Sequence, residues 1–170
     1  MTTVKRITLA GGCFWGLEEL LRQIPGVVHT QVGYAGGSLE HPTYEDICTG
    51  QTGHAESVQV SYDSNTLSEE ELFFEFFKIH DPTTLNRQGN DQGSQYRSAI
   101  FYQDEQQREA AIRVMHQVEA SKAWKSPLVT ELHALTQFWR AEEYHQQYLQ
   151  KNPGGYTCHF VRKLDFKLKS

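Results

Sequence analysis

Cys13 is the residue of this chain whose neighbours most clearly suggest chemistry. Two glycines precede it, which let the backbone turn tightly and let another molecule approach closely. Phe14 and Trp15 follow it and offer an apolar surface that favours contact with sulfur. The pattern predicts a nucleophilic thiol beside an aromatic platform, and the alternative is a buried cysteine that acts as a small hydrophobic residue.

The residues on either side predict that Cys13 lies where a strand turns into a helix. Residues 4–10 alternate in part, as in a strand, and apolar residues at helical spacing run from Phe14 to Ile24, before Pro25-Gly26. The N-terminal end of a helix carries free N–H groups and the positive end of the dipole, which favour a thiolate. We therefore expect the pKa of Cys13 to lie below the ~8.5 of a free cysteine.

Two further cysteines, Cys48 and Cys158, bring the total to three, too few and too odd in number for a disulfide framework. A reduced cytosolic compartment, with any disulfide transient and catalytic, fits this usage better. Cys158 follows an Asn-Pro-Gly-Gly run, in a segment (152–170) that we expect to be a flexible tail. It could capture a sulfenic acid as a disulfide, or be an ordinary buried thiol. Cys48, beside Ile47, is expected to be an inert core residue.

Glu56 is an acid placed in register with apolar residues. Residues 54–62 alternate, so that Glu56 shares one strand face with Val58, Val60 and Tyr62. If that face is buried, Glu56 is buried at one end of it.

Composition excludes several classes of protein. The net charge is −5 with acids and bases mixed, which argues against a nucleic-acid-binding face. The eight histidines are scattered without paired spacing, so no metal site is expected. No run approaches the ~18 apolar residues of a membrane helix, and residues 1–12 do not form a signal peptide. We expect a cytoplasmic protein with no membrane contact.

The remaining patterns predict how the chain holds these residues. They indicate strands at 27–34, 96–102 and 128–135, and helices at 68–80, 104–122 and 141–151. Residues 38–53 read as a long loop or short irregular helix, and residues 83–95 as a polar surface loop unless a site uses it. Length allows one domain, residues 1–170. The fold class is therefore α/β (α+β), a two-layer sandwich whose mixed sheet is covered by helices.

Several motifs together resemble the A-type peptide methionine sulfoxide reductase family. They cover nearly the whole chain from Lys5 to about Tyr156 and are individually specific. In chain order they are Gly12-Cys13-Phe14-Trp15, Val32-Gly33-Tyr34-Ala35-Gly36-Gly37, Pro42-Thr43-Tyr44, Cys48-Thr49-Gly50, Thr52-Gly53-His54-Ala55-Glu56, His80-Asp81-Pro82 and Asn90-Asp91-Gln92-Gly93-Ser94-Gln95-Tyr96-Arg97-Ser98.

The resemblance implies that the Cys13 thiolate attacks the sulfur of a methionine S-sulfoxide, free or in a peptide or protein. Glu56 occupies the acid position of the family and would supply a proton to the oxygen, since burial raises a carboxyl pKa. Tyr44 and Tyr96 occupy the positions of phenolic donors to that oxygen. Asp91 would assist substrate binding, and Phe14 and Trp15 would hold the S-methyl group.

The same resemblance implies how the enzyme is recycled. Cys13 becomes a sulfenic acid, Cys158 condenses with it to form a disulfide, and thioredoxin or another dithiol reduces the disulfide. Because Cys158 is the one cysteine downstream, we expect one recycling step. We also expect no bound cofactor and a monomer. Two other classes remain open: a Cys–His hydrolase or acyltransferase, and a module that binds oxidised methionine without turnover.

Overall fold

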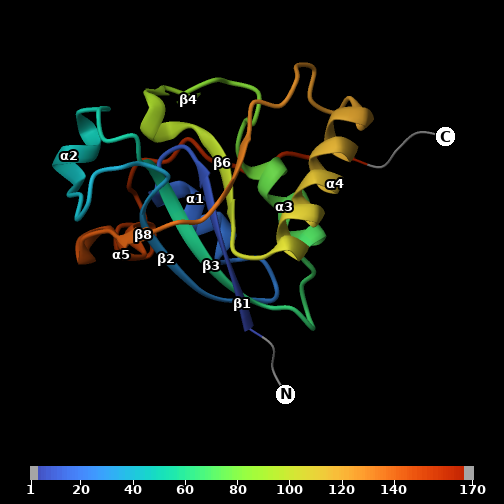
Figure 1. Cartoon of the computed structure of the whole chain (residues 1–170), viewed down its shortest axis with the longest axis horizontal. Coiled ribbons are helices and arrows are strands. Elements are labelled where there is room, and N and C mark those ends of the chain that lie inside the picture. The colour runs from blue at the N-terminus through green and yellow to red at the C-terminus, as the bar shows by residue number, and fades with distance from the viewer. Residues whose placement is uncertain (1–3, 167–170) are drawn as a thin grey trace.

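The computed structural model describes residues 4–166, and a six-stranded mixed sheet organises them (Figure 1). The strand order is β7-β6-β1-β3-β2-β8. Strands β6 and β7 are parallel, and the other neighbours are antiparallel. The strands are β1 (Val4–Gly11), β2 (Val27–Ala35), β3 (Ala55–Asp63), β6 (Ser98–Tyr102), β7 (Glu131–Ala134) and β8 (Phe138–Arg140).

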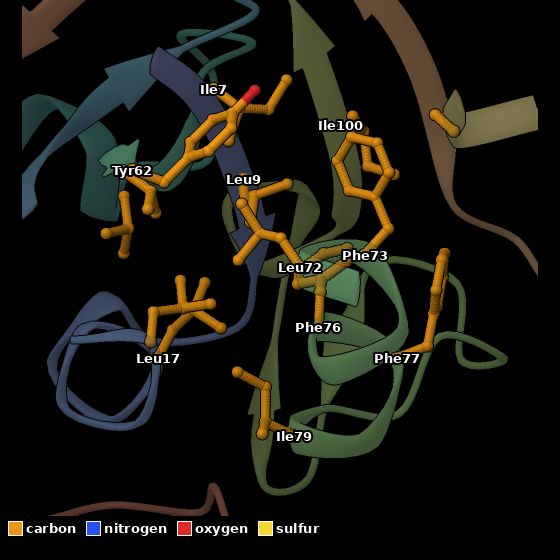
Figure 2. Packing of buried hydrophobic residues seen from close by; sticks show 14 of the residues in the cluster. Ile7, Leu9, Leu17, Tyr62, Leu72, Phe73, Phe76, Phe77, Ile79 and Ile100 are labelled. Atoms are coloured by element: carbon orange, nitrogen blue, oxygen red, sulfur yellow. The ribbon is translucent and has the colours of Figure 1, made fainter. Parts of the chain in front are cut away.

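Three longer helices bury their apolar faces against one face of this sheet, as the sequence predicts. The core contains the fully buried Leu9, Leu17 and Phe76, which come from β1 and from two of these helices (Figure 2). The helices are α1 (Phe14–Leu21), α3 (Glu69–Ile79) and α4 (Glu105–Ser121). This arrangement confirms the α/β class with a mixed sheet.

The short elements lie in the connections. They are the helices α2 (Tyr44–Cys48) and α5 (Tyr148–Lys151), the 3₁₀ turns η1 (Ser94–Tyr96) and η2 (Glu143–His145), and the strands β4 (Arg87–Gln88) and β5 (Asp91–Gln92). The predicted polar loop 83–95 thus contains a small hairpin of β4 and β5. Across residues 4–166, no helix has both the length and the apolar composition that crossing a bilayer requires.

The second face of the sheet is lined by four small side chains and by the buried ring of Phe101. Ala10, Ala35, Ala55 and Ala99 are fully buried there, and Phe138 from β8 packs against them. Alanine leaves room for backbone to approach closely, so the connection from β7 to β8 can pack on this face. Strand β8 was not predicted from the sequence, because its three residues carry no alternation that distinguishes them.

The prediction of one continuous helix over residues 141–151 is wrong, because the segment forms η2 and α5 instead. Gln147, the N-cap residue of α5, adopts a left-handed φ of 48°, which separates α5 from η2. The side chain of Gln146 accepts from the backbone N–H of Val32 at 2.9 Å and donates to its carbonyl, also at 2.9 Å. The backbone N–H of Gln147 donates to Glu18 Oε1 at 2.8 Å. These tertiary hydrogen bonds outweigh the helical propensity of the segment.

The prediction that Cys48 belongs to the core is also wrong, because its side chain is exposed. It is the last residue of α2, and only Ile47 of that helix is buried. The boundaries of two predicted strands also differ. The strand predicted at 128–135 begins at Glu131, and the one predicted at 96–102 begins at Ser98, after η1.

The segment that follows α5 contacts the domain at several points within the described residues, and two of its side chains are buried there. His159 is buried, and its Nε2 lies 2.6 Å from the carbonyl oxygen of Gly11. Phe166 is buried too and stacks on Phe74 with ring centroids 5.9 Å apart. The flexibility expected of residues 152–170 stays a prediction.

Candidate active site

Cys13 lies between β1 and α1, as its sequence neighbours predict. It is the N-cap residue of α1, and its carbonyl accepts the first helical hydrogen bond, from Leu17 N at 3.3 Å. Gly12 before it has a φ of +94°, a conformation that favours glycine. A Cβ on Gly12 would lie 2.5 Å from Cγ of Gln88. Glycine at this position therefore permits both the turn and the close approach of the 83–95 segment.

Glu56 is buried at the end of β3 that faces this turn. Its Oε1 accepts a hydrogen bond from the backbone N–H of Phe14, the residue after Cys13, at 3.1 Å. Burial raises the pKa of Glu56 to about 8, despite the opposing effect of that hydrogen bond. The carboxyl group is thus mostly protonated at neutral pH, and the predicted burial of Glu56 on the apolar face of its strand is confirmed.

The pKa of Cys13 differs from the sequence-based expectation. Burial raises its pKa above the usual range, and the nearby carboxyl groups of Glu56 and Asp91 and the thiol of Cys158 add to the rise. The expected lowering of the Cys13 pKa by the helix N-terminus is therefore wrong. The positive end of an eight-residue helix does not offset the loss of solvent around a side chain that is 9% exposed.

Aromatic rings lie around the Cys13 thiol and the Glu56 carboxyl group. Phe14 lies with its ring centroid 5.8 Å from that of Tyr34 and 6.5 Å from that of Tyr44. Trp15 stacks on Tyr148 at 3.8 Å, nearly parallel. The predicted platform of Phe14 and Trp15 is therefore part of a larger aromatic wall that α2 and α5 complete.

His145 is a residue that sequence reasoning did not single out. It is fully buried, and its Nδ1 accepts a hydrogen bond from Trp15 Nε1 at 2.9 Å. Its ring centroid lies 4.4 Å from that of Tyr44 and 5.1 Å from that of Phe14. The spacing of His145 from Cys13 in the chain carries no signal, so that only the tertiary structure identifies it.

The two predicted phenols, Tyr44 and Tyr96, both lie near Glu56. Burial raises the pKa of both phenols, and the charge of Glu56 raises both further. They are therefore neutral and able to donate at neutral pH. Tyr44 is held by its backbone N–H, which donates to Glu142 at 2.8 Å, and Glu142 also accepts from the Tyr34 hydroxyl at 2.8 Å.

Cys158 contacts Asp91, which belongs to the 83–95 segment that packs against Gly12. The Cys158 Sγ lies 3.9 Å from Asp91 Oδ2, and the hydroxyl of Tyr156 donates to the same oxygen at 3.3 Å. Gly16 permits the tail to cross α1, since a Cβ there would collide with Thr157 Oγ1. The predicted site residues thus come from five separate parts of the chain, which the fold brings to one end of β1 and β3.

The arrangement suits a substrate whose oxygen needs a proton before a thiol can attack the neighbouring atom. One buried carboxylic acid and two phenols can donate to such an oxygen, and Cys13 lies beside them. The aromatic wall offers an apolar, sulfur-friendly surface for a small alkyl group. Among the described residues 4–166, His, Cys, Asp and Glu side chains do not gather in threes as metal ligands would.

Comparison with known proteins agrees with this chemistry. The family model for peptide methionine sulfoxide reductase matches residues 5–169. A peptide methionine sulfoxide reductase MsrA from Clostridium botulinum is 53% identical over 156 residues, 92% of this chain and 98% of its own length. One from Methanothermobacter thermautotrophicus is 50% identical over 164 residues, 96% of each chain.

Solved structures resemble the fold closely. Reduced Mxr1 from Saccharomyces cerevisiae matches with a TM-score of 0.88 at 40% identity, covering 94% of this chain and 93% of that one. Mxr1 in complex with Trx2 matches with a TM-score of 0.64 at 30% identity, covering 94% and 91%. On these matches over nearly its full length, the chain belongs to the peptide methionine sulfoxide reductase family.

Proposed function

We propose that this chain reduces methionine S-sulfoxide in peptides and proteins, with Cys13 as the nucleophile and Glu56 as the acid. The observation that carries the assignment is the pairing of a buried thiol with a buried carboxyl group whose pKa is raised to about 8. A sulfoxide sulfur is a poor electrophile until its oxygen is protonated or strongly hydrogen-bonded. A carboxylic acid that is neutral at pH 7 meets that need where an ordinary glutamate would not.

In the first step, Glu56 gives its proton to the sulfoxide oxygen while Tyr44 and Tyr96 donate hydrogen bonds to it. The oxygen is transferred from the sulfoxide sulfur to the sulfur of Cys13, which becomes a sulfenic acid, and the substrate leaves as methionine. The proton of the Cys13 thiol returns to Glu56, so that no net proton is gained or lost. Because thiol and carboxyl group both begin neutral, the buried site never holds two negative charges.

In the second step, Cys158 condenses with the Cys13 sulfenic acid to give a disulfide and water. An external dithiol then reduces the disulfide by thiol exchange. The complex of the yeast relative Mxr1 with Trx2 supports a thioredoxin as that dithiol. Phe14 and Trp15 would hold the S-methyl group, and Asp91 would assist binding.

The proposal extends to the protein as a whole. We infer a single catalytic domain over residues 1–170, whose tail from residue 152 carries the recycling thiol. The protein would act as a cytoplasmic monomer without a bound cofactor and with a thioredoxin as its reductant.

Single-turnover measurements with a methionine sulfoxide peptide test the two cysteine roles. Cys13→Ser should release no methionine, and turnover in that variant would refute the nucleophile assignment. Cys158→Ser should release about one equivalent of methionine per enzyme and then stop with thioredoxin, since only recycling is lost. Cys48→Ser is the matched control, because Cys48 is exposed on α2, and it should recycle normally.

The mass of the enzyme after one turnover separates the alternative classes. A reductase gains a Cys13–Cys158 disulfide and loses two hydrogens. A hydrolase or acyltransferase would carry a thioester on Cys13 and no disulfide, and a binding module would be unchanged in mass.

A further inference from the structure

Three acceptors surround the thiol of Cys158 before any reaction. Its Sγ lies 3.8 Å from the carbonyl oxygen of Gln88, 3.9 Å from Asp91 Oδ2 and 3.9 Å from His159 Nδ1. To form a disulfide, this thiol must lose its proton as its sulfur attacks Cys13. One of the three neighbours is therefore placed to take that proton.

Two of the three cannot both take up the proton and pass it on to solvent. A backbone carbonyl such as that of Gln88 is not basic enough to hold a proton. His159 is buried, and its Nε2 is held 2.6 Å from the carbonyl oxygen of Gly11, which accepts the ring proton. Burial lowers the pKa of His159 to about 4, because a cationic ring there would lack solvent. His159 thus positions the tail and stays neutral.

Asp91 has the properties that the other two lack. It is only partly buried, so that it can exchange a proton with solvent after the step. Partial burial raises its pKa above the ordinary value, which makes it a stronger base than a solvated aspartate. The Tyr156 hydroxyl, which donates to Oδ2 at 3.3 Å, fixes the carboxylate beside the sulfur.

The charges of the pair also favour transfer of the proton during the attack itself. Burial and the neighbouring Asp91 charge raise the pKa of Cys158, so that a free thiolate is scarce at neutral pH. A thiolate beside an ionised Asp91 would place two negative charges together. Transfer to Asp91 while the sulfur–sulfur bond forms avoids that state.

We propose that Asp91 is the general base that accepts the thiol proton of Cys158 as Cys158 attacks the Cys13 sulfenic acid. This role rests on the function proposed above and is additional to substrate binding. The S–S bond forms as the S–O bond of Cys13 breaks, and the oxygen leaves as water after taking up one proton from solvent. Asp91 returns its proton to solvent, so that a thiol and a sulfenic acid yield a disulfide and water.

The test compares Asp91→Asn with the wild-type enzyme in single turnovers between pH 6 and pH 9. Methionine released reports the first step, and loss of dimedone-reactive sulfenic acid reports disulfide formation. We expect disulfide formation to slow in Asp91→Asn by a factor on the order of 10². Its rate should then rise about tenfold per pH unit, following the thiolate fraction, whereas the wild-type rate should change little.

Asp104→Asn is the matched control, since Asn caps a helix as well as Asp does and Asp104 lies at the start of α4. It should alter neither step. If Asp91→Asn binds peptide too weakly for a burst, a saturating concentration of the peptide restores it, and the second step is timed after the burst.

An unchanged rate and pH profile of disulfide formation in Asp91→Asn would overturn the proposal. So would a His159→Asn variant that acquires the tenfold-per-unit dependence while Asp91→Asn does not, because that result makes His159 the base. Absence of a methionine burst in the wild-type enzyme would instead refute the proposed function.

Discussion

Replacement of Glu56 by Gln should make the folded protein more stable and the first step slower. Gln keeps the shape of the side chain and an oxygen for the Phe14 N–H, which donates to Glu56 at 3.1 Å. It cannot release a proton to a sulfoxide oxygen. We expect the first step to slow by a factor on the order of 10² or more, measured as the rate of methionine release in a single turnover.

The stability gain follows from the raised pKa. Glu56 has a pKa of about 8 when folded against an ordinary 4.5, so between these values the folded protein binds more protons than the unfolded chain. The free energy of unfolding must therefore fall as pH rises through this window. At about 1.4 kcal/mol per pH unit, the raised pKa of Glu56 lowers the free energy of unfolding by about 3 kcal/mol at pH 7 and by about 5 kcal/mol at pH 9.

Urea unfolding of both proteins from pH 5 to pH 9 measures this difference. The stability of Glu56→Gln relative to wild type should increase by about 4 kcal/mol across the range. Glu69→Gln is the control with the opposite sign. Glu69 pairs with Lys5 at 2.7 Å at the other end of β1, and its pKa is lowered, so its replacement should cost stability at neutral pH. A pH-independent gap between Glu56→Gln and wild type would refute the burial argument.

Three further outcomes follow from the same contacts. The first-step rate of the wild type should fall above pH 8 as Glu56 ionises, and a burst rate that stays constant to pH 10 would exclude it as the acid. Trp15→Phe removes the donor to buried His145, which should cost about 1–3 kcal/mol in urea unfolding; an unchanged midpoint would mean that another donor replaces it. Gly16→Ala places a Cβ 2.6 Å from His159 Nδ1, and should therefore slow disulfide formation more than methionine release in single turnovers. Equal effects on both steps would contradict the anchoring of the tail across α1.

Local patterns in the sequence were sufficient to predict the elements that hold the two central groups. Alternation along β3 put Glu56 on the face of Val58, and that face is buried. Helical spacing after Phe14 put Cys13 at a strand-to-helix junction. These inferences depend on residues a few positions apart, whose relation the backbone geometry fixes before the chain packs.

Contacts between distant residues decided the rest, because solvent exclusion and hydrogen bonding depend on what packs around a group. The pKa of Cys13 rises through burial and carboxyl groups that no local pattern places near it. His145 meets Trp15 across 130 residues, and Cys158 meets Asp91 across 67. Sequence alone thus determined which groups could react, and the tertiary structure determined their protonation and their partners.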